Sequence, residues 1–225
     1  MSKVFSIAID GPAGAGKSTM AKALARELGA MYLDTGAMYR AVGLYMLNHG
    51  IPVDDEAQVA LHAAEARVDV RYVDGAQRVY LCGEDVSRAI RENEVSAAAS
   101  AVSKVAVVRE LMVARQREIA AGTDVVMDGR DIGTKVLPDA PLKIFLTAAA
   151  EVRAKRRFLE LQAKGQEVPY EQLLKEIIER DHNDATRAVS PMVQAEDAVP
   201  LDSSDMTVDE VVAAIVALAK ERMQA

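Results

Sequence analysis

The sequence contains one cysteine and three histidines in 225 residues. Because Cys82 has no second cysteine to pair with, it cannot form an internal disulfide, which is typical of a protein in a reducing cytoplasm. Its place in a strand-like segment favours a buried thiol or a thiol at a strand edge over a nucleophile. The histidines show no metal-ligand spacing with one another or with Cys82, so we expect no zinc site. They are His49, His62 and His182.

Long apolar segments and an excess of positive charge are also missing. The longest apolar run, Val211 to Ala219, is far shorter than the ~20 residues that span a bilayer. The N-terminal residues before the first polar turn are too poor in apolar side chains to form a signal peptide. With 27 Lys and Arg against 34 Asp and Glu, the net charge of -7 argues against broad binding of a nucleic-acid backbone, although a local basic pocket stays possible. We expect a cytoplasmic protein that binds neither a membrane nor a nucleic-acid polymer.

The composition is that of a folded chain of moderate size. Half of the residues are apolar and 27% are charged, which excludes intrinsic disorder and a disulfide-stapled miniprotein. A chain of 225 residues is longer than a typical domain of ~100–150 residues but short for two. No internal repeat, low-complexity tract or long linker is present. We therefore expect a single domain, residues 1–225, with one large core and insertions.

Apolar strands alternate with helical patterns along most of the chain. A strand at residues 4–9 runs into a glycine-rich turn and then a helix that Gly29 ends, and further strands are expected at 125–127, 142–146 and 198–201, each followed by a helical pattern. Thr207 and Glu210 have the spacing of a capping box at the start of the last helix. That helix is expected to bury Val208, Val211, Val212, Ile215 and Leu218. This order predicts an α/β fold with a central parallel sheet.

Two segments depart from this alternation. Between Arg67 and Val86 the apolar period changes to two, interrupted by Asp74-Gly75, which predicts an inserted antiparallel hairpin. A helical segment around residues 151–180 then places three arginines on one face, and the helical pattern breaks down over residues 179–187. The arginines are Arg153, Arg156 and Arg157.

The strongest chemical signal is a glycine-rich turn after the first strand and before the first helix. It matches G-x-x-x-x-G-K-S/T, the phosphate-binding P-loop. Glycines let successive backbone N–H groups point inward around an anion, and the following helix N-terminus attracts phosphates. Lys17 reaches the β- and γ-phosphates in such loops, and the Ser18 hydroxyl ligates Mg²⁺. The residues of the turn are Gly11, Pro12, Ala13, Gly14, Ala15, Gly16, Lys17 and Ser18.

The class of P-loop protein follows from the remaining motifs. The sequence lacks a D-x-x-G switch and a guanine-binding N/T-K-x-D, which disfavours a GTPase. The length favours a small-molecule kinase over a helicase or a transporter ATPase. Two motifs, residues 33–40 and 127–133, follow expected strands, so ligand groups should gather there at the carboxyl ends of the sheet. Residues 179–187 form a further polar motif.

With these motifs, the chain resembles the bacterial cytidylate kinases of the nucleoside monophosphate kinase family, essentially from end to end. The resemblance rests on GPAGAGKS, DTGAMYR, the hairpin insertion with GEDVS, the stretch from Ser100 to Arg109, DGRDIGT followed by PDAPLKIFL, and RDHNDATR. One departure is Lys135, where family members more often have an apolar residue. The resemblance implies a P-loop kinase core, an NMP-binding insert at about residues 36–105 with the hairpin near 67–86, and a helical lid at about 151–185.

The implied reaction converts ATP and CMP or dCMP into ADP and CDP or dCDP, in pyrimidine nucleotide metabolism, with Mg²⁺ and no prosthetic group. The acceptor is a phosphate oxygen that is already ionised, so catalysis can depend on positioning and charge neutralisation rather than on a strong base. The implied catalytic residues are Lys17, Asp128, Arg130 and Arg180. The implied ATP-binding residues are the turn from Gly11 to Ser18 with Thr19, Arg153 and Arg157. The implied CMP-binding residues are Thr35, Arg40, Ser100, Arg109, Arg130, Asp131, Asp184 and Arg187.

Within that set the resemblance implies separate roles. Arginines hold the CMP phosphate, Asp184 accepts from the sugar hydroxyls, and Ser100, Arg109 and Asp131 read cytosine. Uracil would place a carbonyl against the Asp131 carboxylate, so discrimination against UMP is expected. The enzyme is expected to be a monomer.

Plainer interpretations stand beside these roles. Taken alone, Arg109 would be a solvated charge on a helix, and the lid arginines a solvated helix face. Asp128 is either a Mg²⁺ ligand through water or a turn residue. For the whole chain, the alternatives are another P-loop small-molecule kinase and a nucleotide-binding regulatory module without turnover.

Overall fold

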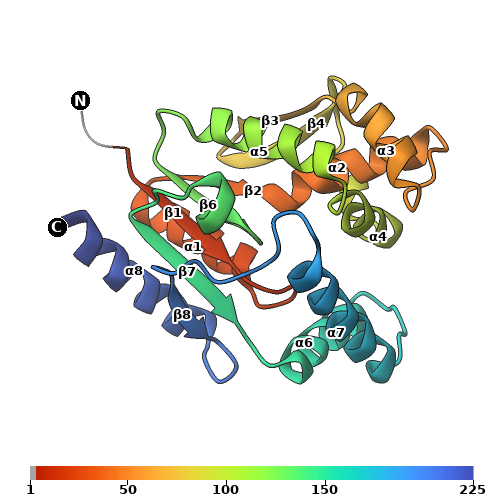
Figure 1. Ribbon diagram of the computed structural model, residues 1–225. Helices are drawn as coiled ribbons and strands as arrows, with labels where there is room; N and C mark the ends of the chain where they lie inside the picture. Colours follow the sequence, from red (N-terminus) through yellow and green to blue (C-terminus); the bar gives the residue numbers. More distant parts are fainter. Residues whose placement is uncertain (1–3, 225) are drawn as a thin grey trace. The chain divides into compact units, whose positions relative to one another are not determined.

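The computed structural model describes residues 4–224 and divides the chain into two compact units (Figure 1). The first unit comprises the described residues up to Tyr32 and those from Thr123 onward, and the second comprises Leu33–Gly122. The expected insert at 36–105 lies within the second unit, and the expected lid at 151–185 lies within the first.

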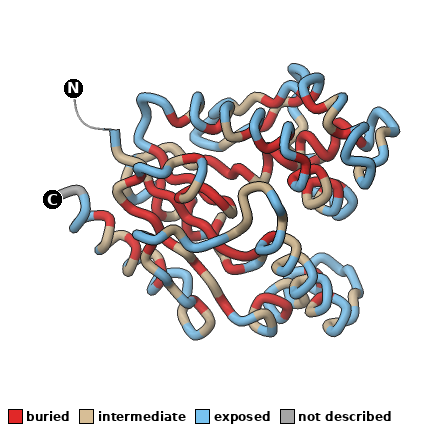
Figure 2. The backbone as a smooth tube through the Cα atoms, in the orientation of Figure 1, coloured by how far each residue is buried: buried red, intermediate tan, exposed pale blue. Residues whose placement is uncertain are grey.

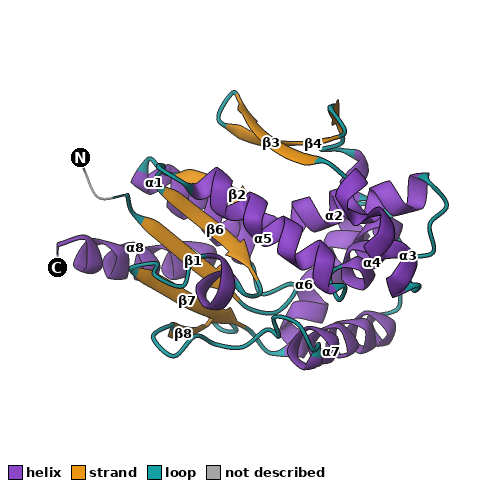
Figure 3. Cartoon of the chain, turned by 45° about the horizontal axis from the view of Figure 1, so that its top comes forward, coloured by secondary structure: helices purple, strands orange, loops and turns teal. Residues whose placement is uncertain are grey.

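A five-stranded sheet with the order β2-β6-β1-β7-β8 organises the first unit. Strand β1 pairs in parallel with β6 and β7, and β7 pairs in parallel with β8, as Figure 3 shows for the orange strands. The parallel α/β class is therefore confirmed. The strands are β1 (Ser6–Asp10), β2 (Met31–Asp34), β6 (Val125–Gly129), β7 (Leu142–Thr147) and β8 (Val199–Asp202).

The core of the first unit lies between this sheet and two helices, α1 (Lys17–Leu28) and α8 (Val208–Gln224). Ile9, Leu24 and Ile215 from these elements are fully buried, in keeping with the red strands of Figure 2. Gly29 ends α1 in the left-handed conformation, with φ 65°, and its N–H donates to the last carbonyls of the helix. The carboxyl end of β1, where the loop before α1 begins, is thus held in place by the close packing of the sheet against these helices.

The capping box of α8 is confirmed. The Thr207 N–H donates to Glu210 Oε2 over 2.8 Å, and the Glu210 N–H donates to Thr207 Oγ1 over 3.3 Å. The expectation that Val208 is buried is wrong, because this first helical residue is 44% exposed. The buried stripe instead follows the i, i+4 spacing of Val211, Ile215 and Ala219.

The helical segment after β7 also differs from the expectation. It forms two helices, α6 (Ala150–Ala163) and α7 (Tyr170–Thr186), which pack against each other. The expected break at residues 179–187 is wrong, since α7 continues to Thr186, whose Oγ1 donates to the His182 carbonyl over 2.7 Å. Strand β6 is followed by a short π-helical turn, η3 (Ile132–Val136), rather than by a full helix, because β7 begins soon after it.

The second unit combines four helices and a small antiparallel sheet among the described residues. Strands β3 (Val68–Val73) and β4 (Ala76–Leu81) pair in the expected hairpin, and β5 (Glu84–Asp85) adds a third strand. Gly43 allows the close approach of two helices, since a Cβ there would lie 2.9 Å from the Ala99 nitrogen. The helices are α2 (Thr35–Asn48), α3 (Glu56–His62), α4 (Asn93–Val102) and α5 (Ala106–Ala120), with short 3-10 turns η1 (Ala63–Glu65) and η2 (Ala89–Arg91).

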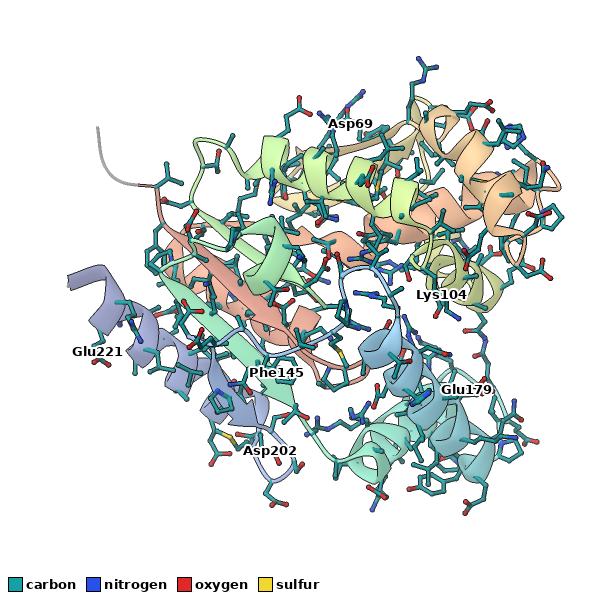
Figure 4. All side chains as sticks on the ribbon, in the orientation of Figure 1. Asp69, Lys104, Phe145, Glu179, Asp202 and Glu221 are labelled. Carbon is teal, nitrogen blue, oxygen red and sulfur yellow. The ribbon has the colours of Figure 1, made fainter. Side chains whose placement is uncertain are left out.

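A salt bridge at the surface of the second unit connects the small sheet to α5. Arg115 Nη2 donates to Asp69 Oδ1 over 2.6 Å, and Asp69 is labelled on this face in Figure 4.

Cys82 is exposed in a turn with φ 51°, so neither a buried thiol nor a strand residue is found. Across residues 4–224, none of the helices is both long and apolar enough to cross a bilayer.

Candidate active site

The glycine-rich turn lies where β1 ends and α1 begins, as expected. Gly11 has φ 143°, and a Cβ at this position would lie 1.9 Å from the Leu146 carbonyl oxygen of β7, so only glycine fits. Lys17 Nζ donates to the Pro12 carbonyl over 2.7 Å, which folds the side chain back along the loop. The loop therefore presents the start of α1 with a buried cation beside it.

Opposing influences act on the pKa of Lys17. Burial, reinforced by the charge of Arg130, lowers the pKa of Lys17 to about 7, although Asp128 and Asp10 act in the opposite direction. A polyphosphate bound here would supply negative charge and restore the proton. The protonation of Lys17 would thus change when an anionic ligand binds.

Ser18 and Asp128 form the oxygen-rich part of the loop region. Ser18 Oγ donates to Asp128 Oδ2 over 2.9 Å, and the Tyr32 hydroxyl donates to Asp128 Oδ1 over 2.9 Å. A hydroxyl and a carboxylate are the donor types that Mg²⁺ prefers, so these residues fit that ion. Within the described part of the chain, no group of three or more acidic, histidine or cysteine side chains could hold a metal. Nucleotide phosphates and waters would therefore complete the coordination.

Asp10 is a site residue that the sequence analysis did not single out. It closes β1 just before the glycine-rich turn, and its two oxygens accept from the backbone N–H groups of Ile132 and Gly133, each over 2.7 Å. Burial raises its pKa to about 6, although both hydrogen bonds act to lower it. Asp10 fixes the turn that follows Arg130 and Asp131. A charged residue at the end of an apolar strand was the available signal.

Four predicted residues meet at the ends of β6 and α7. Arg130 Nε donates to Asp184 Oδ2 over 2.8 Å, and Arg187 lies 3.5 Å from Asp184 Oδ1 and 4.0 Å from Asp131 Oδ1. Burial acts to lower the pKa of Arg130, but the Asp184 carboxylate, together with Asp128 and Asp181, raises it above its usual value. Burial likewise acts to raise the pKa of Asp184, and Arg130 holds it below its usual value. Arg130 and Asp184 thus hold each other in the charged form, and they lie in a cluster with Arg187 and Asp131 that offers two guanidinium groups to an anion.

The three arginines expected in the lid have different environments. The solvated-face interpretation is wrong for Arg153, which is 4% exposed and donates to the Ala13 carbonyl of the loop over 3.0 Å and to Asp181 Oδ2 over 2.6 Å. Arg156 donates to the Ser203 carbonyl over 2.7 Å, which ties α6 to the segment after β8. Arg157 pairs with Glu160 at the surface. The positive charge of Arg180 reaches both Lys17 and Asp184 and lowers the pKa of each, as a minor contribution.

The second unit holds the remaining predicted residues in two groups. Thr35 is the buried first residue of α2, and Arg40, one turn further on, pairs with Asp34 over 2.9 Å. Asp34 was not singled out from the sequence, although an Asp before a helix is a common N-cap.

Arg109 and Ser100 form the other group. The solvated interpretation of Arg109 is wrong, because the residue is 2% exposed. Its Nη1 donates to the Ser103 carbonyl over 3.1 Å, and its guanidinium lies 5.2 Å from the centre of the Tyr39 ring. Ser103 Oγ in turn donates to the Ser100 carbonyl over 2.9 Å. Ser103 therefore connects the two residues expected to read a base.

A glycine-rich loop between β1 and α1, with its serine bonded to a carboxylate on the neighbouring strand, defines a P-loop nucleotide-binding protein. A solved structure of an uncharacterized protein from Eubacterium ventriosum shares the fold, with a TM-score of 0.51, 14% identity and coverage of 96% of this chain and 98% of that chain.

Sequence comparison is more specific. The cytidylate kinase family model matches residues 7–221. A cytidylate kinase of Caldicellulosiruptor bescii is 54% identical over 216 residues, which is 96% of each chain. One of Bacillus licheniformis is 48% identical over 225 residues, the full length of both. The chain belongs to the cytidylate kinase family.

Proposed function

We propose that the protein transfers the γ-phosphoryl group of ATP to CMP or dCMP, giving ADP and CDP or dCDP. An oxygen of the CMP phosphate forms a bond to the γ-phosphorus, the bond to the bridging oxygen breaks, and ADP leaves with that electron pair. The observation that supports this most directly is the buried cluster of Arg130, Asp131, Asp184 and Arg187 in the unit that contains the P-loop. It matches an acceptor that combines a phosphate, a sugar and an amino-bearing base.

The loop from Gly11 to Thr19 binds the phosphates of ATP. Backbone N–H groups and the start of α1 hold the anion, and Lys17 neutralises charge on the transferred group. The Ser18 hydroxyl, and Asp128 through water, would hold Mg²⁺, which would supply positive charge to the phosphates of ATP. The 2.9 Å contact between the two side chains supports a joint role.

The acceptor phosphate needs cations rather than a base, because its oxygen is already ionised. Arg130 and Arg187 supply two guanidinium groups, and Thr35 and Arg40 of the second unit are assigned to the same phosphate. A charge-assisted hydrogen bond of this kind contributes about 1.5–3 kcal/mol. Asp184, already hydrogen-bonded to Arg130, accepts from the sugar hydroxyls.

Cytosine is recognised by the donors Ser100 and Arg109 and by the acceptor Asp131. A carboxylate accepts from the exocyclic amino group of cytosine, whereas the corresponding carbonyl of uracil would leave buried groups without partners. CMP and dCMP are therefore preferred over UMP.

The helices α6 and α7 act as the lid over ATP. Arg153 contacts the P-loop through Ala13, and Arg157 and Arg180 supply further charge to the triphosphate. When these helices close over the site with their positive charge, water is excluded, and the phosphoryl group is protected from hydrolysis. The enzyme works as a cytoplasmic monomer with Mg²⁺ and without a prosthetic group, and it binds no membrane or nucleic-acid polymer.

The test is ADP formation by the purified protein with ATP, Mg²⁺ and, separately, CMP, dCMP, UMP, AMP, GMP and shikimate. We expect CMP and dCMP to give the highest kcat/KM. Equal or faster turnover of AMP, GMP or shikimate would overturn the substrate assignment. Binding of ATP and CMP without any ADP release would indicate a regulatory module instead.

A further inference from the structure

One side chain of the small antiparallel sheet forms hydrogen bonds to Asp34, the N-cap residue of α2. Gln77, on β4, accepts from the Asp34 backbone N–H through Oε1 over 2.7 Å, and its Nε2 donates to the Asp34 carbonyl over 3.3 Å. Both backbone polar groups of Asp34 are therefore bonded to one amide that lies 43 positions away in the sequence. Two such bonds fix the orientation of a peptide segment better than one, because rotation about a single bond would break the other.

Asp34 in turn fixes Arg40. Asp34 Oδ1 accepts from the Ala37 N–H over 2.9 Å as the N-cap of α2, and Oδ2 accepts from Arg40 Nη2 over 2.9 Å. Arg91 Nη1 lies 3.4 Å from the same Oδ2. Because Asp34 is 6% exposed, its carboxylate has little freedom to move away from these partners. The position of the Arg40 guanidinium thus depends on Asp34, and that of Asp34 depends on Gln77.

We infer that Gln77 is a positioning residue for the acceptor phosphate, acting through Asp34 and Arg40. This rests on the assignment of Arg40 to the CMP phosphate under the proposed function. An arginine that is already held in place loses less conformational freedom when the phosphate binds, and so contributes more to affinity. The inserted sheet then has a specific task in this enzyme, which is to hold the residue at the end of β2 in register with the start of α2.

The sheet itself does not require Gln77. The ladder between β3 and β4 runs from Val68 opposite Leu81 to Val73 opposite Ala76, with Gln77 opposite Tyr72. Replacing one side chain leaves these backbone bonds in place. We therefore expect loss of the Gln77 amide to affect Asp34 rather than to unfold the unit.

The experiment compares the wild type with Gln77→Leu, Arg40→Ala and the double variant in steady-state kinetics. We expect Gln77→Leu to raise the KM for CMP about tenfold, as loss of the two hydrogen bonds implies, with kcat and the KM for ATP changed less than about twofold. In the Arg40→Ala background the same substitution should have no further effect on the KM for CMP. Gln58→Leu, an exposed glutamine in the same unit, is the matched control and should leave all constants unchanged.

Each other outcome has a distinct meaning. An equal rise in KM with and without Arg40, or a parallel rise in the KM for ATP, would show that Gln77 acts on the fold in general and would overturn the inference. An unchanged KM in Arg40→Ala would instead refute the phosphate role of Arg40 under the proposed function. NMR of the Arg40 Nη–H protons, which include the donor to Asp34, separates the two, since their exchange with solvent should speed up in Gln77→Leu but not in Gln58→Leu, whatever Arg40 binds.

Gln77→Glu covers the case in which Gln77→Leu does not fold. It has nearly the same shape and keeps the acceptor for the Asp34 N–H, but it replaces the donor by a second oxygen that faces the Asp34 carbonyl. We expect a higher KM for CMP here as well. An unchanged KM for CMP in this folded variant, together with an unchanged exchange rate of the Arg40 Nη–H protons, would overturn the inference.

Discussion

Lys17 should take up a proton when ATP binds at mildly alkaline pH. Burial, reinforced by the charge of Arg130, lowers the pKa of Lys17 to about 7. At pH 8 about nine in ten molecules would therefore hold a neutral Lys17 amine. ATP places its phosphates beside this amine, and opposite charge at such a distance favours the protonated form.

The expected magnitude is about 0.9 proton taken up per ATP bound at pH 8, because the bound phosphates should hold Lys17 in its protonated form. Calorimetry measures this number directly. The observed binding enthalpy is plotted against the ionisation enthalpy of several buffers, and the slope is the number of protons exchanged. A phosphate monoester has its second pKa near ~6, so the ATP phosphates contribute little at pH 8.

Lys17→Arg is the matched control, because arginine stays protonated at every pH used here. Its slope should be close to zero at pH 8. A wild-type slope near zero would refute the reasoning, since it would mean that Lys17 is charged before ATP arrives. An equal slope in Lys17→Arg would assign the proton to another group.

Three further predictions concern specificity and stability. Asp131→Asn should reduce the ratio of kcat/KM for CMP to that for UMP by at least about tenfold, since it removes a charge-assisted acceptor for the amino group; an unchanged ratio would contradict its role in reading the base. As burial raises the folded pKa of Asp10 to about 6, uptake of a proton by Asp10 stabilises the folded protein as pH falls, and this contribution to the free energy of unfolding should increase by about 1 kcal/mol between pH 8 and pH 5.5. Asp10→Asn has no titrating group at this position and should lack the increase in urea unfolding; an equal pH dependence in both proteins would refute the raised pKa. Thr207→Ala should cost about 1 kcal/mol in the same assay through loss of the α8 cap; no loss would show that the capping box does not contribute.

The helices and strands that could be predicted from the sequence are those whose formation depends on residues close together in the chain. The run that became β1 and the turn that follows it could be placed from apolar spacing and glycines alone, and the capping box at Thr207 needs only residues three apart. The change of period between Arg67 and Val86 likewise identified the antiparallel sheet.

Contacts between distant residues could not be predicted in this way. Nothing near Arg109 in the sequence indicates that Tyr39 and the Ser103 carbonyl bury its charge, and a helical position alone favours a solvated side chain. The same holds for Arg153, which is buried by the P-loop carbonyl of Ala13.

Polar motifs were also misleading as signals of secondary structure. The last turns of α7 carry charged residues on several faces, so the apolar period disappears there although the helix continues to Thr186. Asp184 and Arg187 lie three positions apart and come together because of that helical continuation.

The central claim is transfer of the γ-phosphoryl group of ATP to the phosphate of CMP. The most direct measurement is incubation with ATP labelled in its γ-phosphate, Mg²⁺ and CMP, followed by separation of the products. We predict that the label appears in the β-phosphate of CDP, in an amount equal to the ADP formed, and that Lys17→Ala abolishes this transfer while retaining the fold. Label released as inorganic phosphate, with none in CDP, would contradict the account.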